Sequence, residues 1–367
     1  MPELLTLKGM NNTVTADIKE NQERGKFMKK VLKLLVLGLL VFASFGECAP
    51  LPSKALSIGM AVEFMDHAAC AYISQDKGWF EEEGLNLNSY ESYVTGMALA
   101  SALARGDIQV AYMCLIPAIN VYANAEVPIK IVAGTHKYGY GLAVNPEKIK
   151  NVKDLEESGI RIGCVREGGA VDVLLHKTID KYNLDEKKIL NNIRRMNPPK
   201  QVLAIKTGQL DAAFLPEQWA TMAEAFGFKM LLTSQKIWPE MQGSVLVVKE
   251  ELIRDTPEVV EKLVRITQKA TDWINQNPRE AAEIVARQLQ EAGGNLFPVE
   301  IAGIATQTEM TPEVLLKSMD RLEYVTGIDP EVVQETIDYV VQLGYIKSSF
   351  KAEEIICLLY TSDAADE

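Results

Sequence analysis

The sequence predicts an α/β protein of two lobes, each a mostly parallel sheet flanked by helices. From Leu56 onward, short apolar runs alternate with helical stretches, the order typical of parallel βαβ units. The alternation occurs in two halves, and ALASALARGDIQVAYMCLIPAI in the first resembles KQVLAIKTGQLDAAFLPEQW in the second. Two strand-like runs, YGLAVN (140–145) and SVLVVKE (244–250), stand where the chain would cross between the halves.

In the first half, the expected strands are SIGMAV, LNLNSYE, VAYMCL and IKIVAGT. The first helix, AACAYISQDKGWFEEEG, should end at Gly84, because glycine suits a helix stop. MALASALARGD and IPAINVYANA follow as helices, the second with Pro117 in its first turn. Strand and helix therefore alternate up to the first crossing.

The second half repeats this order with strands GIRIGCV and DAAFL and helices AVDVLLHKTIDKY, QVLAIKTGQ and QWATMAEAFG. After it, Thr256 and Pro257 form a helix start of cap followed by proline. The expected helices beyond are EVVEKLVRITQKATDWINQNP, REAAEIVARQL, VEIAGIATQTEM and PEVVQETIDYVVQLG. We predict a hinged clamshell with lobe 1 at 54–140 and 249–350 and lobe 2 at 141–248.

The two ends of the sequence differ from the rest. Residues 28–49 have a basic start, an apolar run and small residues, which predicts a signal peptide or lipoprotein-type leader; a retained membrane anchor is the alternative. Cys48 is the candidate lipidation site, although Glu47 stands where a small residue is usual. We expect 1–27 to be a mis-called extension, 357–367 to be a sequencing artefact, and the protein to be exported to the periplasm or cell surface.

Composition excludes several classes of function. With 47% hydrophobic and 24% charged residues, the chain is globular. A net charge of -12 argues against a nucleic-acid partner. Cys70, Cys114 and Cys164 are far apart and lack CxxC spacing, so they predict buried apolar side chains, neither a disulfide framework nor a zinc site. We expect no metal, no cofactor and a monomer.

Polar and glycine residues gather where the expected strands end. The loops are EFMDHAAC with Asp66 and His67, SYVTGMALA with Thr95 and Gly96, CLIPAI with Pro117, and, from the second lobe, REGGAV and LPEQW. In open α/β sheets the ligand lies outside the carboxyl ends of the strands. Helix amino ends converging there would favour an anion, since their N–H groups and dipoles attract negative charge.

Each of these residues also has a plain structural interpretation. Gly168 and Gly169 could be only a tight turn, and Thr95 only a helix cap. His67 could serve as a structural hydrogen-bonding group, and Tyr140 and Trp219 as core aromatics. Asp66 and Glu217 are most simply solvated loop carboxylates; facing a ligand, they would favour one that carries a donor or cationic group.

Motifs of catalysis are missing from the sequence. REGGAV lacks the GxGxxG turn, and neither GxxxxGK[ST] nor GxSxG occurs. His67, His136 and His176 show no metal-binding spacing. A nucleophilic dyad of His67 with Cys70 or Cys114 is the one catalytic arrangement that these residue types allow. We expect a binding protein and not an enzyme.

The segments DHAACAYISQDKGWFEEEGLNL, YVTGMALASALARGDIQVAYMCLIPAI and DAAFLPEQWATMAE carry a resemblance to a known family. The chain resembles the solute-binding proteins of ABC importers for nitrate, sulfonate, taurine and bicarbonate, with the thiamine-precursor binding proteins as close relatives. The resemblance covers roughly 57–275 and, more loosely, the helices up to Lys347. It implies a type II periplasmic-binding fold that closes on a small ligand and delivers it to the permease and ATPase subunits of an importer.

The resemblance also implies the ligand-contact positions. They are Asp66, His67, Thr95, Gly96, Leu115, Ile116, Pro117, Gly168, Gly169, Ala170, Val171, Glu217, Gln218 and Trp219. Sulfonate binders usually carry a small hydroxyl residue after the third strand, where this chain has the apolar Cys114-Leu115-Ile116. This departure leaves room for an aromatic or heterocyclic ligand, with Tyr138, Tyr140 and Trp219 as stacking candidates.

Two other classes of function share the fold that the resemblance implies. One is an enzyme, similar to thiamine-pyrimidine synthases or menaquinone-pathway dehydratases; this chain lacks the cysteine-rich motif of the synthases. The other is an extracytoplasmic sensor of ligands. Transport binding is the function we expect.

Overall fold

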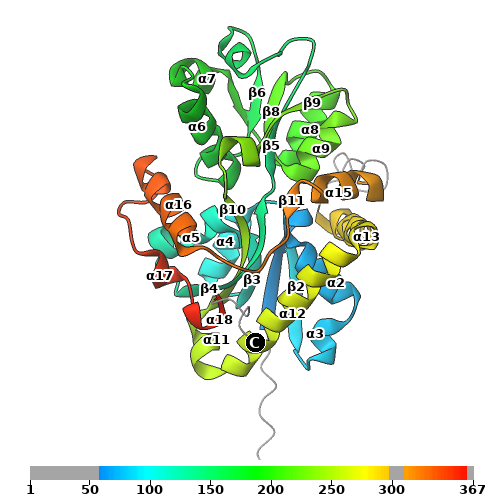
Figure 1. Cartoon of the computed structure of the whole chain (residues 1–367), viewed down its shortest axis with the longest axis vertical. Helices are drawn as coiled ribbons and strands as arrows, with labels where there is room; N and C mark the ends of the chain where they lie inside the picture. The colour runs from blue at the N-terminus through cyan, green and yellow to red at the C-terminus, as the bar shows by residue number, and fades with distance from the viewer. Residues whose placement is uncertain (1–57, 297–309, 362–367) are drawn as a thin grey trace, which may run out of the picture. The chain divides into compact units, whose positions relative to one another are not determined.

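Two β-sheets organise the part of the chain that the computed structural model describes, residues 58–296 and 310–361 (Figure 1). The first sheet has the strand order β11-β4-β10-β3-β1-β2, and the second has β7-β6-β8-β5-β9. The predictions for 1–27, the leader at 28–49, Cys48 and most of the helix VEIAGIATQTEM lie outside these ranges. Of the predicted artefact at 357–367, the structure describes only 357–361.

The first sheet consists of β1 (Ile58–Glu63), β2 (Leu87–Tyr93), β3 (Val110–Cys114), β4 (Ile129–Tyr138), β10 (Gln242–Lys249) and β11 (Leu322–Glu323). The second consists of β5 (Tyr140–Val144), β6 (Ile162–Cys164), β7 (Ile193–Arg195), β8 (Ala212–Pro216) and β9 (Lys229–Thr233). We call the first sheet with its helices the first lobe and the second sheet with its helices the second lobe. Both stand out in Figure 1, the second above the first.

The crossing strands make both sheets mixed. β1 runs parallel to β2 and β3, and β6 runs parallel to β7 and β8. β10 is antiparallel to β3 and β4, and β5 is antiparallel to β8 and β9, because each returns from the other lobe. The chain has rejoined the first sheet by Gln242, whereas the sequence analysis places this return at 249. The predicted α/β fold of two helix-flanked sheets is confirmed.

The two lobes share one order of strands. Without the short β11, the first sheet reads β2-β1-β3-β10-β4, and the second reads β7-β6-β8-β5-β9. β3 and β8, the strands of the two similar sequence segments, hold the same place in these orders. A helix precedes and a helix follows each of them. The two similar segments of the sequence therefore correspond to a repeated arrangement of helix, strand and helix.

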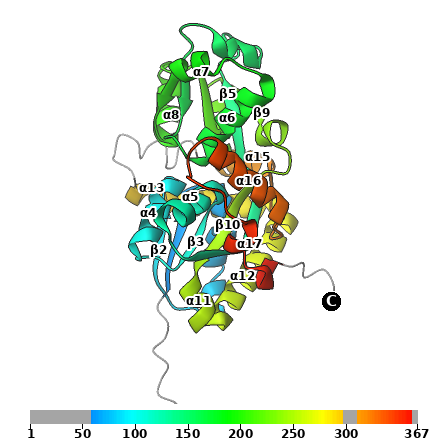
Figure 2. The same ribbon diagram turned by 90° about the vertical axis from the view of Figure 1, so that its left-hand side faces the viewer.

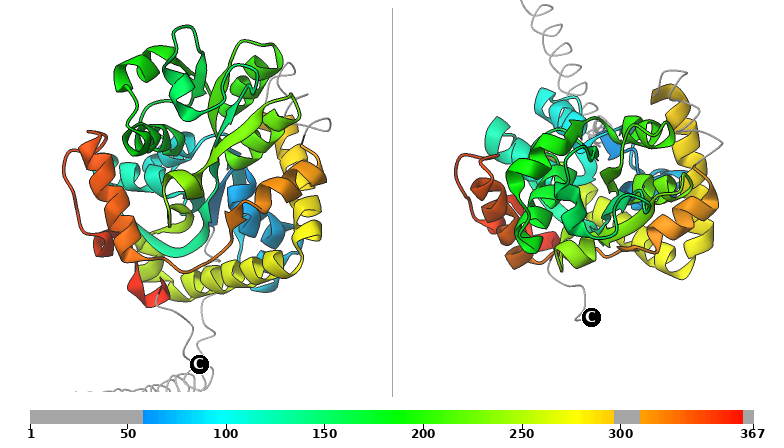
Figure 3. Two further views of the ribbon diagram at one scale, coloured as in Figure 1. Left: turned by 45° about the horizontal axis from the view of Figure 1, so that its top comes forward. Right: turned by 90° about the horizontal axis from the view of Figure 1, so that it is seen from above.

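Helices cover both faces of the sheets (Figure 3). Those of the first lobe up to β4 are the 3-10 helix η1 (Asp66–Ala68), α2 (Ala69–Asp76), α3 (Trp79–Glu82), α4 (Gly96–Arg105) and α5 (Leu115–Ala125). Those between the two crossings are η2 (Val152–Glu156), α6 (Ala170–Tyr182), α7 (Glu186–Asn192), α8 (Pro198–Lys206), α9 (Glu217–Glu224) and α10 (Ser234–Ile237). After β10 come α11 (Glu250–Asp255), α12 (Pro257–Gln276), α13 (Pro278–Leu296), α15 (Pro312–Met319), α16 (Pro330–Gln342), α17 (Ala352–Ile355) and α18 (Leu358–Thr361).

The first predicted helix is divided in two. Gly78 has φ 72°, a left-handed conformation that ends α2 and lets α3 begin in a new direction. The predicted stop at Gly84 is confirmed as a second left-handed glycine, with φ 69°, just beyond α3. The elements β7, β9, α7, α10, α11 and α15 were not anticipated. Of these, β7 and α10 span only three and four residues, too few for their periodicity to show.

The core forms two clusters on opposite faces of the sheets. Met60 and Val62 of β1 belong to one cluster, and Ala61 between them belongs to the other. The first cluster includes α2, α9, α12 and α13, and the second includes α4, α5, α6 and α16. Each cluster contains residues of both lobes. The lobes are therefore packed together by apolar contacts in addition to the two crossings.

The segment after α15 contacts both lobes (Figure 2). α16 packs on α5 of the first lobe, and the Tyr339 hydroxyl of α16 donates to Asp180 Oδ2 of α6 at 2.6 Å. Tyr345, which follows α16, donates its hydroxyl to Asp172 of α6. None of the helices in the described ranges is long and apolar enough to cross a membrane.

Candidate functional site

A cavity of about 450 Å³ lies between the lobes, at the carboxyl ends of strands from both sheets. Its walls begin where β1, β2, β3, β6, β7 and β8 end. The lining residues are Met65, Val94, Thr95, Gly96, Met97, Ala98, Cys114, Pro117, Tyr140, Val165, Arg166, Gly169, Ala170, Val171, Arg195, Met196, Asn197, Pro198 and Pro216. The position agrees with the general rule for ligands of open α/β sheets.

Helix amino ends from both lobes meet at this cavity. Thr95 caps α4, accepting from the Ala98 amide at 3.3 Å, and Asn197 caps α8, accepting from Lys200. Gly169 is the residue before α6. The first amides of a helix have no acceptor within it, so the amino ends of α4, α6 and α8 are suited to receive an anion at the cavity.

Gly96 is required by the closeness of its neighbours. A Cβ atom at this position would lie 2.3 Å from Oε1 of Glu63 and 2.6 Å from Cγ of Pro117. No side chain fits between α4 and the end of β1. The amino end of α4 therefore packs directly on the buried Glu63 carboxyl.

Two arginines of the second lobe reach the cavity. Arg195 Nη1 donates to the Val165 carbonyl at 2.7 Å and is ion-paired with the buried Asp172. Its side chain stays 28% exposed. Arg166 also lines the cavity and is exposed. Cationic side chains and helix amino ends together give this wall an affinity for anions.

The rest of the cavity wall is apolar. Methionine side chains come from two loops, at Met65 and Met196, and from the first turn of α4, at Met97. Val94 and Val165 also line this wall. Methionine adapts its shape to irregular partners. The cavity therefore suits a solute with an anionic group and an apolar body.

Below the cavity lies a buried polar cluster. The Cys114 thiol donates to Glu63 Oε2 at 2.8 Å, and the Tyr140 hydroxyl donates to Cys114 Sγ at 2.8 Å. The Cys114 amide donates to Glu63 Oε1 at 3.1 Å. His67 Nδ1 is 3.8 Å from Cys114 Sγ. Burial raises the pKa of Glu63 to about 7, despite the two hydrogen bonds from Cys114.

This cluster does not have the properties of a nucleophilic dyad. Burial raises the pKa of the Cys114 thiol well above its usual value, and the nearby Glu63 raises it further. Burial lowers the pKa of His67 well below its usual value, and the neighbouring His136 acts in the same direction. Cys70 is 3.3 Å from Thr271 Oγ1, and burial raises its thiol pKa to about 11. A thiol kept protonated is a weak nucleophile.

The structure divides the predicted site residues into two groups. Those that line the cavity are Thr95, Gly96, Pro117, Tyr140, Gly169, Ala170 and Val171. Those that do not are Asp66, His67, Leu115, Ile116, Tyr138, Gly168, Glu217, Gln218 and Trp219. Leu115 and Ile116 are buried in the core at the start of α5. Gly168, with φ 78°, forms the turn before α6 and donates its amide to Asp172.

The interpretation of Asp66 and Glu217 as solvated carboxylates is wrong, because both are buried. Asp66 is fully buried and accepts from Ser318, and Glu217 is 1% exposed and pairs with Arg321 at 2.9 Å. The Gln218 side chain accepts from the Asp66 amide at 2.7 Å. These contacts join η1, α9 and α15.

Trp219 is a core residue. Its side chain is fully buried, with its ring centroid 6.3 Å from that of Phe64. Tyr138 is partly exposed and has φ 67°, next to Gly139 at the first crossing. Neither side chain lines the cavity. Tyr140 is the one stacking candidate that reaches it, through a ring whose hydroxyl is bonded to Cys114.

The sequence analysis missed the loop of Arg195, Met196, Asn197 and Pro198. It follows β7, a strand of three residues, and leads into α8. A signal was present, since Asn197 followed by two prolines is a typical helix start. Placing that helix start after a strand would have added Arg195 to the predicted site.

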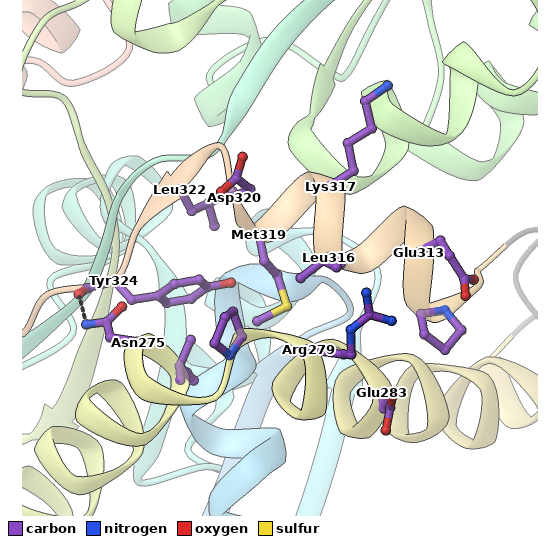
Figure 4. Close-up of a pocket in the computed structure, with 13 residues that line it drawn as sticks. Asn275, Arg279, Glu283, Glu313, Leu316, Lys317, Met319, Asp320, Leu322 and Tyr324 are labelled. Atoms are coloured by element: carbon purple, nitrogen blue, oxygen red, sulfur yellow. Dashed lines mark hydrogen bonds between the residues drawn. The ribbon is translucent and has the colours of Figure 1, made fainter.

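A second, larger cavity of about 630 Å³ lies between α12, α13 and α15 (Figure 4). Figure 4 shows Met319 and Leu316 of α15 beside Arg279 of α13, with Tyr324 and Asn275 at one end. The Asn275 side-chain amide donates to the Tyr324 carbonyl at 3.1 Å. None of the predicted site residues lines this cavity.

The NMT1-like family matches residues 49–289, a range that includes every strand end around the first cavity. The chain belongs to this family. The match confirms the resemblance inferred from the sequence, and it spans both lobes and their crossings.

Individual relatives are more distant. A protein of Brucella abortus (strain 2308), described provisionally as a binding protein, is 26% identical over 258 residues, covering 67% of this chain and 77% of that protein. The taurine-binding periplasmic protein of Escherichia coli (strain K12) is 23% identical over 235 residues, covering 63% of this chain and 68% of that protein. Both are described as binding proteins, not enzymes.

The fold is that of known solute-binding proteins. The alkanesulfonate-binding protein SsuA from Xanthomonas axonopodis pv. citri, solved with MOPS bound, superposes with a TM-score of 0.65 at 15% identity. The superposition covers 82% of this chain and 98% of SsuA. The structure is thus a type II periplasmic-binding fold with mixed sheets flanked by helices.

Proposed function

We propose that this protein is the extracytoplasmic solute-binding component of an ABC importer and that it captures a small organic anion in the cavity between its lobes. The observation that carries this proposal is the convergence of three helix amino ends and two arginines on one cavity with apolar walls. The family and the binding proteins that share its fold support the same role.

The size of the cavity favours an organic solute over a bare inorganic ion. About 450 Å³ lies within the range of pockets for drug-sized molecules. A nitrate or bicarbonate ion would leave most of it empty. An alkanesulfonate, an aromatic carboxylate or a heterocycle with an acidic group would place its charge at the amino ends of α4 and α6 and its body against Met65, Met97 and Met196.

The mechanism that we propose is capture by closure and transfer to the permease. A solute that contacts both lobes stabilises the closed state by the difference between its affinities for the closed and open states. The closed protein would then dock on the permease, which the ATPase subunits drive. We propose export by the leader at 28–49, which would place the protein on the side of the membrane from which solutes are taken up.

A thermal-shift screen tests the proposal. The panel contains nitrate, bicarbonate, taurine, alkanesulfonates, thiamine pyrimidine, riboflavin and aromatic carboxylates, all with EDTA present. A solute that binds only the folded protein raises the melting temperature by mass action. We expect a rise with an organic anion and none with nitrate or bicarbonate. No rise with any member, and no small molecule in mass spectrometry of the purified protein, would contradict a solute-binding role.

The variant Gly169→Asp tests whether a solute found in this screen binds in the cavity between the lobes. Gly169 has φ -79°, and aspartate is a favoured residue before a helix, so α6 should form normally. The added carboxylate would oppose an anion at the amino end of α6, and we expect affinity to fall by roughly tenfold or more. Gly169→Asn is the matched control, with the same shape and no charge. Equal affinity of the two variants would remove α6 from the site.

A further inference from the structure

Three potential metal ligands meet below the solute cavity. They are Glu63 at the end of β1, His67 in η1 and Cys114 at the end of β3. One donor atom from each lies within 4.8 Å of the other two. Their exposed fractions are 0%, 1% and 4%. Glu63 and His67 are close in the sequence, whereas Cys114 comes from a distant strand and is brought to them by the sheet.

The His67 ring is oriented as in a metal site. Its Nε2 is 2.7 Å from the carbonyl oxygen of Gly139, which can only accept, so Nε2 carries the proton. Nδ1 is therefore left with a free lone pair, 3.8 Å from Cys114 Sγ. Histidines that bind metals commonly donate their other N–H to a carbonyl in this way.

Gly139 allows this orientation. It has φ 93°, and a Cβ atom there would lie 2.5 Å from His67 Nε2. The site is therefore preorganised on the histidine side.

The distances around the sulfur are close to those of a tetrahedral site. Zinc ligands at ordinary Zn–S and Zn–N distances lie about 3.6 Å apart. His67 Nδ1 and Cys114 Sγ already have nearly this separation. Glu63 Oε2, at 2.8 Å from the sulfur, holds the thiol proton and has to withdraw by about 1 Å when an ion replaces that proton.

We propose that Glu63, His67 and Cys114 bind one divalent transition-metal ion of the zinc class. A thiolate, an imidazole and a carboxylate are ligands that select zinc over magnesium or calcium. Binding forms metal–sulfur, metal–nitrogen and metal–oxygen bonds, and the thiol proton leaves to solvent. The Tyr140 hydroxyl, 2.8 Å from the sulfur, donates to the thiolate.

The ion has one coordination position left, as three-ligand zinc sites do. Cys114 and Tyr140 line the solute cavity, so the ion would lie next to it. The ion would add positive charge opposite Arg166 and Arg195. It would also explain why a cavity suited to anions has a carboxyl and a thiol at its base.

Cobalt and zinc titrations of the full chain test the site. The protein is stripped with EDTA, desalted and titrated with CoCl2 and no solute. We expect one cobalt per chain, with a thiolate-to-cobalt charge-transfer band in the near ultraviolet that stoichiometric zinc removes. Absence of this band in the folded wild-type protein overturns the proposal and needs no variant.

Variants assign the ligands. Cys114→Ser should abolish the charge-transfer band and weaken zinc binding by more than about 100-fold, and Glu63→Gln should weaken binding while retaining the band. Cys70→Ser is the control, because its buried thiol contacts Thr271 and lies outside the cluster. Circular dichroism checks folding. A band that survives in folded Cys114→Ser overturns the assignment. The solute screen contains EDTA and this titration contains no solute, so either proposal can fail alone.

Discussion

The two lobes bury their carboxyl groups in opposite ways. In the first lobe, Glu63 and Asp66 are fully buried, and neither is paired with a lysine or arginine among the described residues. Burial raises the pKa of both to about 7. Their partners are neutral groups: the thiol and amide of Cys114 for Glu63, and the hydroxyl of Ser318 for Asp66.

Carboxylates around the second lobe are buried with arginines. Asp172, Asp211 and Glu217 are each 1% exposed or less. The ion pairs are Asp172 with Arg195, Asp211 with Arg161 at 2.8 Å, and Glu217 with Arg321 at 2.9 Å. Because a buried charge needs a partner, these pairs fix the arginines in place.

The difference separates two tasks at the cavity. The second lobe supplies fixed positive charge through Arg195, which Asp172 holds in position. The first lobe supplies buried carboxyl groups whose hydrogen-bond partners are neutral. Four substitutions break or sharpen this comparison, and they follow from the largest expected effect to the smallest.

Trp219→Ala should have the largest effect, and on stability. The indole is fully buried against Phe64, so its removal leaves a cavity at the junction of the lobes. We expect the free energy of unfolding to fall by about 3–5 kcal/mol. Chemical denaturation measures this change. Solute affinity of the protein that remains folded should be unchanged, and a selective loss of affinity would return Trp219 to the binding site.

Arg195→Met tests the buried ion pair between Arg195 and Asp172 in the second lobe. Among the described residues, it leaves the buried Asp172 with the Gly168 amide and the Tyr345 hydroxyl as partners. We expect a loss of about 2–4 kcal/mol in unfolding free energy. We also expect an anionic solute to bind at least about tenfold more weakly.

The neighbouring Arg194→Met is the matched control for this variant. Arg194 is exposed and donates to the carbonyls of Asn191 and Ile193. Its substitution should change unfolding free energy by less than about 0.5 kcal/mol. Calorimetric titration and denaturation of both variants provide the comparison. Similar losses in the two would show that Asp172 does not need Arg195.

Gly96→Ala tests how tightly the base of the cavity is packed. The added methyl group would meet the Glu63 carboxyl and Pro117, and both must move. We expect unfolding free energy to fall by about 1–3 kcal/mol. Gly294→Ala in α13 is the control, since nothing lies within 4 Å of the added atom and alanine favours a helix. A stable Gly96→Ala would mean that α4 can retreat from Glu63.

Asp211→Asn should have the smallest effect and should depend on pH. Hydrogen bonds from Arg161, and further ones from Lys148, hold the pKa of Asp211 well below its usual value. Its stabilising effect is therefore complete above about pH 4 and is lost as pH falls below that. Both cations are partly exposed, so we expect about 1 kcal/mol at pH 7. The unfolding free energies of the wild-type protein and Asp211→Asn, measured by denaturation, should converge toward pH 3. A difference that stays constant with pH would exclude a contribution from the ionisation of Asp211.

The fold and part of the cavity could be predicted because their signals are local. Alternating strands and helices place the strand ends, and a cap such as Thr95 or a glycine such as Gly169 marks the helix start that follows. A strand end followed by a helix amino end is then a candidate wall of the site. Arg195 has the same signal and was missed because its strand is only three residues long.

The remaining features depend on contacts between distant segments. Asp66 and Glu217 looked exposed because their partners lie far along the chain, Ser318 in α15 and Arg321 in the turn that follows it. Trp219 is followed by polar residues as well as apolar ones, and only the packing of α9 on Phe64 decides that it is buried. No local pattern contains that information.

The hydrogen bond between His67 and Gly139 joins the base of the cavity to the first crossing between the lobes. Any rotation of the peptide at Gly139 changes the environment of one nitrogen-bound proton, the one on Nε2. The nuclear magnetic resonance frequency of that proton is therefore sensitive to the conformation of the chain at the first crossing. A titration that follows it would record closure without a label on either lobe.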